Sequence, residues 1–381
     1  MPTMRFVWSV FAFLSASLSG MLFAADPMVA VEQPSTVPVS ASIARARAML
    51  EKEIVPKVPG LAVAVAVNGK IVWSEAFGYA DWETKRPVTP TTRFRIASVS
   101  KPLTAAGLML LVERGQLDLD APVQKYVPDF PVKPEGVVTT RLLGGHLGGI
   151  RHYQGTEALL DRPFADVHAG LKIFADDPLV APPGVRFNYT TYGWSLISAV
   201  MESAAHRPFL DYMGDEVLKA LGMIHTRPDR AGVLDPDCTL YYVRGSDGKF
   251  AAAPPIDSSY KWAGGGFLST AEDLVHFGSV LLQPGFLQES SLTLLFTSQK
   301  TAEGKPTGYG IGWFVQKDRH GRPVYFHTGG QQGATSVLFM RPDAGIVVAI
   351  VCNLSEAPIT GRGMAIADLF APPTAASVIA K

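Results

Sequence analysis

The stretch RIASVSKPLTAAGLMLLVERG, residues 95–115, places a serine three residues before a lysine at the start of an apolar run. Residues 103–112 are apolar on almost every side, which is typical of a buried helix, and Gly115 is expected to end it. Because residues three apart share a helix face, Ser98 and Lys101 are predicted to lie side by side. This pair is therefore a candidate for nucleophilic chemistry.

The same Ser-x-x-Lys spacing occurs twice more, in GSDGK (245–249) and SSYK (258–261). In GSDGK the Asp-Gly pair predicts a tight hairpin. SSYK lies between PPID and WAGGG, which both have the composition of loops. Neither segment predicts a helix that would hold the two side chains together, so we interpret both matches as coincidences.

The composition limits the class of partner. The chain has 381 residues, 47% of them hydrophobic and 18% charged, with 34 basic and 34 acidic side chains. A nucleic-acid-binding surface usually brings an excess of basic residues, so this balance argues against nucleic acid. A peptide or a small molecule is the expected partner.

The N-terminal segment, residues 1–25, contains one arginine, a long apolar stretch and no acidic residue. Because small residues close it, the segment predicts a signal peptide. The stretch is also just long enough to span a bilayer, so an uncleaved anchor is the alternative, and membrane contact is expected only in that case. Either way the protein is predicted to be exported, and so periplasmic or secreted. Residues 26–40 predict a flexible lead-in.

Strand-like segments gather near both ends of the chain, and the middle is mostly helical. Residues 61–81 predict two strands around Asn68-Gly69, a strong hairpin signal. We therefore predict an α/β (α+β) fold: one antiparallel sheet from both chain ends, flanked by helices, with a middle helical lobe and the active site at the seam. The other strand-like segments are YGIGWFVQ (309–316), PVYFHTGG (323–330), TSVLFM (335–340) and GIVVAIVCN (345–353).

Two further segments carry candidate site residues. PPGVRFNYTTYGWSLISAVMES, residues 182–203, places Tyr189 just before a predicted helix. There the positive end of the helix dipole would lower the pKa of the tyrosine, and aromatic packing under a loop is the alternative. HTGG, residues 327–330, ends a predicted strand, and its glycines would let a substrate approach the backbone closely. His327 taken alone indicates a hydrogen-bonded or exposed histidine more often than a catalyst.

In this order and context, the three segments resemble the serine beta-lactamase and penicillin-binding-protein superfamily, in its class C-like branch. The pattern of that branch is Ser-x-x-Lys, Tyr-x-Asn and Lys/His-Thr-Gly. The chain is closely similar to the LACTB-like proteins of animal mitochondria. The resemblance implies a beta-lactamase/transpeptidase-like fold, with a catalytic domain at 41–372 and a tail at 373–381. The segments that carry it are PGLAVAVAVNGKIVWSEAFGYAD (59–81), RIASVSKPLT (95–104), GQLDLDAPVQKYVPDFP (115–131), HLGGIRHY (146–153) and HTGGQQGATSVL (327–338).

The resemblance also implies a role for each matching residue. Ser98 would be the acylated nucleophile, Lys101 the base that takes its proton, and Tyr189 the shuttle to the leaving group. An apolar cleft disfavours the charged form of a lysine, which suits a base. The backbone N–H groups of Ser98 and Gly330 would form the oxyanion hole, and no metal or cofactor is implied. Substrate binding would fall to Thr191, His327, Thr328 and Gly329.

Two positions depart from the family pattern. Thr191 stands where asparagine is usual, so a hydroxyl with one donor hydrogen replaces an amide with two. The LACTB-like proteins share this threonine. His327 stands where dedicated beta-lactamases have a lysine that helps to hold the drug's carboxylate. A mostly neutral imidazole attracts a carboxylate less, so weak or absent beta-lactamase activity is expected.

The predicted function is an exported serine hydrolase that acts through a Ser98 acyl-enzyme on peptide or peptide-like amide bonds. The LACTB resemblance alone implies the peptide preference. An esterase, or a D-Ala-D-Ala carboxypeptidase with weak beta-lactamase activity, is the first alternative. A non-catalytic binding protein, or one that forms homo-oligomers or filaments as the relatives suggest, is an alternative of another class. Specificity is expected to lie in loops around residues 225–262.

Three other features predict structure only. His146 and His152 lack a carboxylate or further histidine at ligand spacing, so no metal site is predicted. Residues 269–272, Ser-Thr-Ala-Glu, predict a capping box that begins a helix. Cys238 and Cys352 are the two cysteines of the chain. Buried thiols are favoured for them, and a disulfide is the open alternative.

Overall fold

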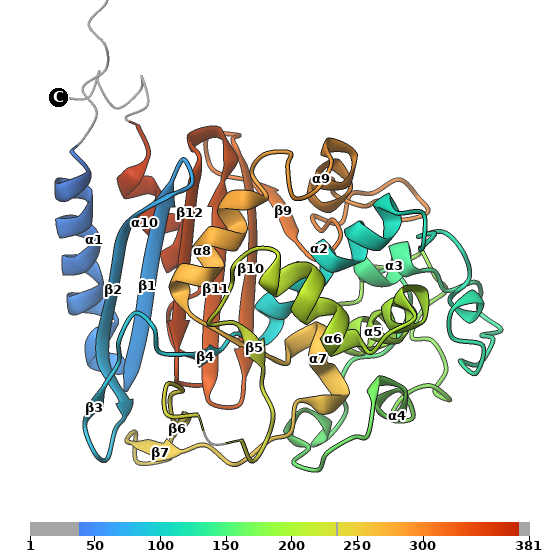
Figure 1. Ribbon diagram of the computed structural model, residues 1–381, viewed down its shortest axis with the longest axis horizontal. Coiled ribbons are helices and arrows are strands. Elements are labelled where there is room, and N and C mark those ends of the chain that lie inside the picture. Colours follow the sequence, from blue (N-terminus) through green and yellow to red (C-terminus); the bar gives the residue numbers. More distant parts are fainter. Residues whose placement is uncertain (1–37, 234, 373–381) are drawn as a thin grey trace, which may run out of the picture. The chain divides into compact units, whose positions relative to one another are not determined.

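The computed structural model of the protein describes residues 38–233 and 235–372, and Figure 1 shows how its helices and strands are arranged. The predicted signal peptide or anchor and the predicted C-terminal tail lie outside the described residues. The predicted lead-in ends too late, because Val39 and Ser40 already belong to helix α1 (Val39–Glu53). The apolar contacts of this helix explain its start: Ala46 and Leu50 are fully buried against the sheet.

The predicted hairpin is confirmed at the N-terminal edge of the sheet. Strands β1 (Gly60–Val67) and β2 (Lys70–Asp81) are antiparallel neighbours joined by Asn68 and Gly69. Both turn residues have a positive φ, +50° and +77°, as an Asn-Gly turn between two paired strands requires.

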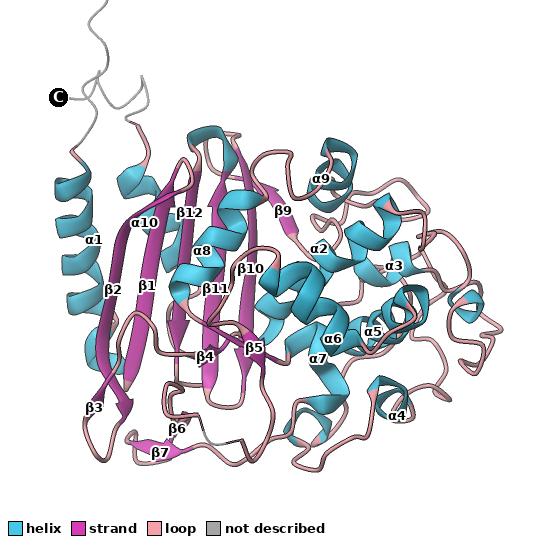
Figure 2. Ribbon diagram, viewed as in Figure 1, coloured by secondary structure: helices cyan, strands magenta, loops and turns pink. Residues whose placement is uncertain are grey.

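One antiparallel sheet combines the two ends of the chain, as predicted. Its seven strands run in the order β3-β2-β1-β12-β11-β10-β9. The central contact pairs β1 with β12, where Leu61 lies opposite Cys352. Figure 2 shows the strands side by side with helices on both faces. The remaining strands of this sheet are β3 (Arg86–Pro87), β9 (Phe314–Lys317), β10 (Pro323–Gln331), β11 (Ala334–Arg341) and β12 (Ile346–Cys352).

The two faces of the sheet have different partners. Because side chains alternate along a strand, Leu61 and Val65 of β1 point to one core and Ala62 and Ala64 to the other. The first core is covered by α1 and α10 (Arg362–Phe370), which are joined where Ser42 Oγ of α1 donates to Leu369 O at 2.6 Å. The alanine side packs against helix α8 (Ala271–Val280), because small side chains let a helix approach the sheet closely.

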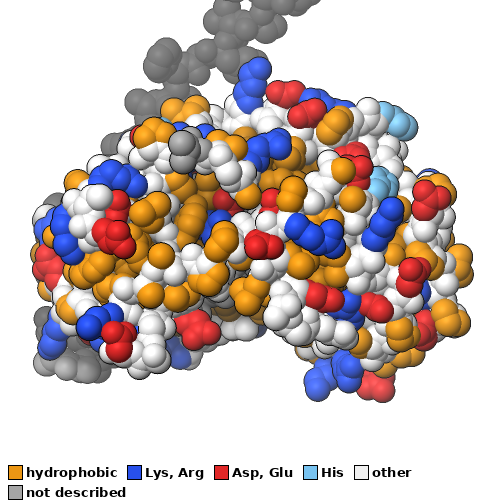
Figure 3. Space-filling model, turned by 90° about the horizontal axis from the view of Figure 1, so that it is seen from below, with side chains coloured by type: hydrophobic (Ala, Val, Ile, Leu, Met, Phe, Trp, Pro, Cys, Tyr) orange, Lys and Arg blue, Asp and Glu red, His pale blue; other side chains and the backbone are white. Residues whose placement is uncertain are grey.

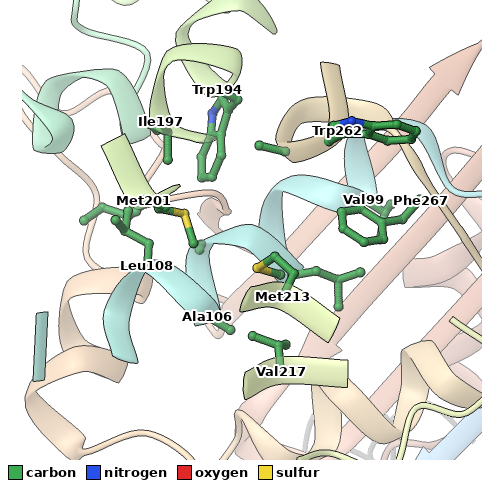
Figure 4. Packing of buried hydrophobic residues seen from close by; sticks show 14 of the residues in the cluster. Val99, Ala106, Leu108, Trp194, Ile197, Met201, Met213, Val217, Trp262 and Phe267 are labelled. Carbon is green, nitrogen blue, oxygen red and sulfur yellow. The ribbon is translucent and has the colours of Figure 1, made fainter. Parts of the chain in front are cut away.

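The helical lobe surrounds helix α2 (Ser100–Glu113), which is buried on nearly all sides, as its apolar sequence predicts. Met201 of α5 (Tyr192–Ala205) and Met213 of α6 (Phe209–Met213) lie beside it in Figure 4. The methionines pack so closely that Gly107 of α2 has Met213 Sδ at 2.8 Å from the place a Cβ would take. The other helices are α3 (Thr140–Gly144), α4 (Val167–Leu171), α7 (Trp262–Gly265) and α9 (Glu289–Phe296).

Two smaller sheets complete the strands of the fold. Strands β4 (Phe94–Arg95), β8 (Phe267–Ser269) and β5 (Arg227–Pro228) form one of them. Strands β6 (Tyr242–Arg244) and β7 (Phe250–Ala252) form the hairpin predicted from GSDGK. β4 directly precedes the Ser98 segment, so the small β4-β8-β5 sheet fixes where that segment enters the lobe.

Some local predictions are corrected or completed. The cap of α8 is Thr270, whose hydroxyl accepts from Asp273 N at 3.1 Å, so the predicted capping box begins one residue too early. Ser269 Oγ instead lies 2.8 Å from Thr226 Oγ1. Both cysteines are buried free thiols.

The distribution of surface charge and the length of the apolar helices both bear on the kind of partner. On the face seen from below in Figure 3, basic and acidic side chains are interspersed among apolar ones, and neither sign gathers into one patch. Within residues 38–233 and 235–372, no helix is both long enough and apolar enough to cross a membrane.

Candidate active site

The candidate nucleophile lies on a short 3₁₀ turn, Ala97–Val99, between β4 and α2. Ala97 has φ +46°, in the left-handed region that costs a residue with a Cβ roughly 1–2 kcal/mol. Ala97 and Val99 are buried, whereas Ser98 is partly exposed. The sharp turn therefore presents the serine hydroxyl to the cavity, and the surrounding packing maintains the strained backbone.

Strand β10 presses against this turn. A Cβ at Gly329 would lie 2.3 Å from Ile96 O and 2.3 Å from Ser336 Oγ, so a side chain has no space there. Ser336 Oγ donates to Ile96 O at 2.6 Å and ties the neighbouring strand to the same turn. Gly329, expected to contact substrate, does not line the cavity that contains Ser98. Glycine is required at this position because β10 approaches the Ser98 turn too closely to leave space for a side chain.

Lys101, one helical turn after Ser98, is fully buried. Its Nζ lies 2.9 Å from Ser98 Oγ and 3.5 Å from Thr191 Oγ1, and it donates to Gly264 O at 2.7 Å. The predicted Ser98–Lys101 contact is thus present. No carboxylate of the described residues forms an ion pair with Lys101 Nζ. Burial, and next the positive charge of Lys261, hold the pKa of Lys101 well below its usual value, which favours the neutral amine.

Tyr189 lies over the same lysine, with its ring centroid 4.9 Å from Lys101 Nζ. The predicted fall of its pKa is wrong. Burial raises the pKa of Tyr189 above its usual value, and the Ser98 hydroxyl only partly opposes this. The ring is enclosed by His146, whose centroid is 4.2 Å away. Tyr189 is therefore a neutral hydroxyl that can donate to or accept from Ser98.

Thr191 and His152 form a second wall. Thr191 N donates to His152 Nδ1 at 3.3 Å, so the imidazole accepts at this nitrogen. Burial lowers the pKa of His152 to about 4, so the ring stays neutral at ordinary pH. His146 likewise accepts from Thr190 N through Nδ1, at 3.2 Å. Among the described residues, no group of three His, Cys, Asp or Glu side chains is arranged to hold a metal.

The tautomer of His327 follows from its two contacts. Its Nδ1 lies 2.7 Å from Thr328 O, and since a carbonyl only accepts, Nδ1 carries the proton. Its Nε2 then accepts from the Tyr309 hydroxyl at 2.9 Å. Burial lowers the pKa of His327 to about 3. Both ring nitrogens are engaged within the protein, so His327 is a neutral part of the wall.

These residues surround a cavity of about 460 Å³. The two predicted oxyanion-hole residues, Ser98 and Gly330, both line it, as does Thr328. No Asp or Glu is among the lining residues. The lining consists of Ala97, Ser98, His152, Tyr153, Ala158, Leu159, Tyr189, Thr191, Lys261, Gly264, Gly265, Phe314, His327, Thr328, Gly330, Gln331 and Gln332.

Lys261 is the lining residue that sequence reasoning set aside. Ser258 and Lys261 do not form a Ser-Lys pair like that of Ser98 and Lys101. The hydroxyl of Ser258 instead donates to Asp229 Oδ2, at 3.0 Å. Lys261 itself is only 2% exposed and lines the cavity. Its signal in the sequence was weak, because a lysine in a loop-like segment is ordinarily on the surface. By contrast Lys249, from the other rejected match, is 84% exposed.

The pH profile of hydrolysis is expected to follow Lys101. Only the neutral amine can accept the Ser98 proton, so kcat/KM for a neutral ester should rise with pH through the pKa of Lys101 and then level off. Because that pKa is lowered, the plateau should begin below the value usual for lysine. Titration from about pH 5 to pH 10 would measure the inflection.

A matched variant checks this assignment. Lys261→Met removes a positive charge that lowers the pKa of Lys101, so it should move the inflection upward. A profile that is flat over the range, or an inflection that Lys261→Met moves downward, would contradict the assignment. The pKa values of His152 and His327, at about 4 and 3, lie below this range.

Comparison with known proteins identifies the family. The sequence matches the beta-lactamase family over residues 47–370. The chain belongs to the beta-lactamase family. Within this family it is 32% identical, over 418 aligned residues, to the human (Homo sapiens) mitochondrial serine beta-lactamase-like protein LACTB, covering 82% of this chain and 76% of the human protein. The predicted resemblance is thus confirmed.

Two solved structures agree with the fold. The octameric penicillin-binding protein homologue from Pyrococcus abyssi is 26% identical, with a TM-score of 0.73, over 87% of this chain and 76% of that chain. EstCE1, described as a hydrolase with promiscuous acyltransferase activity, is 22% identical with a TM-score of 0.75, over 87% of this chain and 98% of that chain. The predicted fold class is confirmed, and the family is one of serine hydrolases.

Proposed function

We propose that this protein is a serine hydrolase that forms an acyl-enzyme on Ser98 and acts on peptide or peptide-like amide bonds. The contact that carries the proposal is Lys101 Nζ at 2.9 Å from Ser98 Oγ, in a buried position where no described carboxylate pairs with the amine. An amine whose charged form is disfavoured beside a partly exposed hydroxyl is suited to take its proton.

The proposed reaction begins when Ser98 Oγ attacks the acyl carbon of the substrate. Its proton goes to Lys101 Nζ, and the negative charge on the acyl oxygen is stabilised by the N–H groups of Ser98 and Gly330. The leaving group takes a proton through the Tyr189 hydroxyl and departs, leaving an ester on Ser98. Water then attacks that ester with the same groups in the reverse roles, which releases the acid and restores the serine.

The first alternative is an esterase or a D-Ala-D-Ala carboxypeptidase, since the same groups would cleave an ester or a D-amino-acid peptide. Weak beta-lactamase activity goes with this alternative. Neutral His327, with Nδ1 and Nε2 engaged by Thr328 O and Tyr309, offers no positive charge to the carboxylate of a beta-lactam. Peptide preference is supported only by the similarity to the LACTB proteins.

Export and self-association are further proposals. The composition of residues 1–25 supports export to the periplasm or out of the cell. The human relative is named as a mitochondrial protein, so delivery to another compartment is the alternative. A homo-oligomer is supported by the Pyrococcus abyssi homologue, which is described as octameric.

Covalent labelling tests the proposed acyl-enzyme. The purified protein is mixed with a fluorophosphonate and, separately, with a fluorescent penicillin, and the labelled mass is measured. We expect one fluorophosphonate adduct, and fragmentation of the labelled peptide should place it on Ser98 and not on neighbouring Ser100. The penicillin adduct should form slowly or not at all, because the neutral imidazole of His327 stands at the position where dedicated beta-lactamases have a lysine that holds the drug's carboxylate.

The outcomes separate the candidate functions. A fluorophosphonate adduct with no penicillin adduct would favour amide or ester hydrolysis over beta-lactam binding. Rapid penicillin labelling would favour the carboxypeptidase alternative. No adduct from either probe, in protein shown to be folded by circular dichroism, would reject the acyl-enzyme and favour a non-catalytic binding or filament role.

A further inference from the structure

The cavity contains a second buried lysine that the proposed reaction does not use. Lys261 lies on the 3₁₀ turn Ser259–Lys261, is 2% exposed, and lines the cavity together with Ser98. The aromatic ring of Tyr260 lies beside it, with its centroid 5.3 Å from Lys261 Nζ. Burial lowers the pKa of Lys261 to about 8, so the protonated form is still the main one at neutral pH.

The nearest acidic groups are committed to other partners. Asp229 Oδ2 accepts from Arg95 Nε at 2.7 Å and from Ser258 Oγ at 3.0 Å. Asp257 Oδ1 accepts from the backbone N–H of Ser259 at 2.7 Å and from its hydroxyl. Neither carboxylate forms an ion pair with Lys261, and in the described part of the chain the structure gives Lys261 Nζ no hydrogen bond. Lys261 thus lines the cavity with no hydrogen-bond acceptor for Nζ among the described residues, and a ligand in the cavity can supply one.

A second donor in the same cavity also lacks a partner. Gln331, at the end of β10, lines the cavity, and its Nε2 atom is buried without a hydrogen-bond partner among the described residues. Its Oε1 faces Gly265, at 3.8 Å from the position a Cβ would take there. The cavity thus contains two unmatched donors, one of them charged, and its lining includes no Asp or Glu.

We propose that Lys261 and Gln331 bind a carboxylate of the substrate, so that the enzyme prefers acyl donors or leaving groups that carry this group. The inference rests on the proposed hydrolase function and specifies its substrate class. A carboxylate has the acceptor oxygens that an ammonium and an amide N–H can share. Lys261 lies on the turn before α7, so this carboxylate site is separate from the position of His327 on β10.

Matched pairs of substrates measure this preference. On the acyl side, the p-nitrophenyl monoester of glutaric acid is compared with its methyl-masked form. On the leaving-group side, hippuryl-phenyllactic acid is compared with its carboxamide. In each pair the ratio of the two kcat/KM values cancels changes in the Ser98 and Lys101 chemistry. A preference in the first pair would place the carboxylate on the acyl group, and one in the second pair would place it on the leaving group.

Lys261→Met removes the charge while keeping a side chain of similar length. In the pair that shows the preference, we expect the ratio of carboxylate to masked substrate to fall about 10- to 100-fold, as loss of a charged hydrogen bond implies. Lys261→Arg should retain most of the preference. Gln331→Leu should lower the ratio by about 3- to 10-fold, as loss of a neutral hydrogen bond implies, and it provides the test if Lys261→Met does not fold. Exposed Lys249→Met, from the other rejected Ser-x-x-Lys match, is the control and should change nothing.

The result that overturns the inference is a wild-type ratio near one in both pairs, or a preference that survives both Lys261→Met and Gln331→Leu. This failure is distinguishable from failure of the proposed function. If the fluorophosphonate labels Ser98 while the ratios are flat, the hydrolase proposal stands and the carboxylate site is rejected. If no adduct forms and no ester is hydrolysed, both proposals are rejected.

Discussion

Replacement of Ser98 by alanine is expected to lower kcat/KM for ester and amide substrates by on the order of 10⁴- to 10⁶-fold. The hydroxyl is the only proposed source of the bond to the acyl group, and Lys101 Nζ at 2.9 Å would have no proton to take. Because Ser98 is partly exposed, its loss should have little effect on stability. Steady-state kinetics with a p-nitrophenyl ester, alongside thermal unfolding, would measure both.

Ser100→Ala is the matched control for this experiment. Ser100 is fully buried two residues away, and its hydroxyl accepts from Phe267 N at 3.3 Å, outside the proposed chemistry. We expect this variant to lose about 1 kcal/mol of stability and to keep its activity. Activity retained in Ser98→Ala would reject the nucleophile. Activity lost in Ser100→Ala but not in Ser98→Ala would show that Ser100, and not Ser98, is the nucleophile.

The parts of the site that depend on local geometry could be predicted from the sequence. Ser98 and Lys101 are joined by a single helical turn, so their spacing and the apolar run after them were sufficient. The sheet built from both chain ends was also predictable, because Asn68-Gly69 and four apolar segments near the C-terminus mark its strands. These predictions succeeded because nearby residues determine the hairpin and the helix.

The properties that depend on distant residues could not be predicted. The pKa of Tyr189 was expected to fall because of the helix that follows it, but burial under His146 and other rings raises it. The partner of His327 is the Tyr309 hydroxyl, which no motif marked. A helix dipole acts on its own terminus, whereas desolvation depends on which residues the fold brings together.

Lys261 shows the same limit most clearly. Its segment was predicted to be a loop, whereas the structure has the 3₁₀ turn Ser259–Lys261 leading directly into α7. The buried pair Arg95–Asp229, which Ser258 joins, attaches this loop to β4 and so holds Lys261 beside the cavity. Only a tertiary contact of this kind distinguishes it from exposed Lys249, since both lysines have the same spacing to a serine.

Replacement of Lys101 by methionine is expected to lower kcat/KM by about 10²- to 10⁴-fold and to leave a measurable residual activity. Methionine keeps the apolar length of the lysine stem in a site that is fully buried, and removes the one amine within reach of Ser98 Oγ. Fluorophosphonate labelling of Ser98 should become slow but not vanish, because the N–H groups of Ser98 and Gly330 remain to stabilise the oxyanion.

The pH profile separates a base from a cation that only positions the serine. If Lys101 is the base, the residual activity of Lys101→Met should lose the inflection seen in the wild type, since the titrating group is gone. Small alkylamines added to Lys101→Ala should restore part of the rate, because they can occupy the space that the lysine stem leaves. A Lys101→Met variant with wild-type kcat/KM and an unchanged inflection would show that another group takes the proton. Tyr189, which lines the same cavity as Ser98, is the next candidate, and Tyr189→Phe would then be the variant in which the inflection disappears.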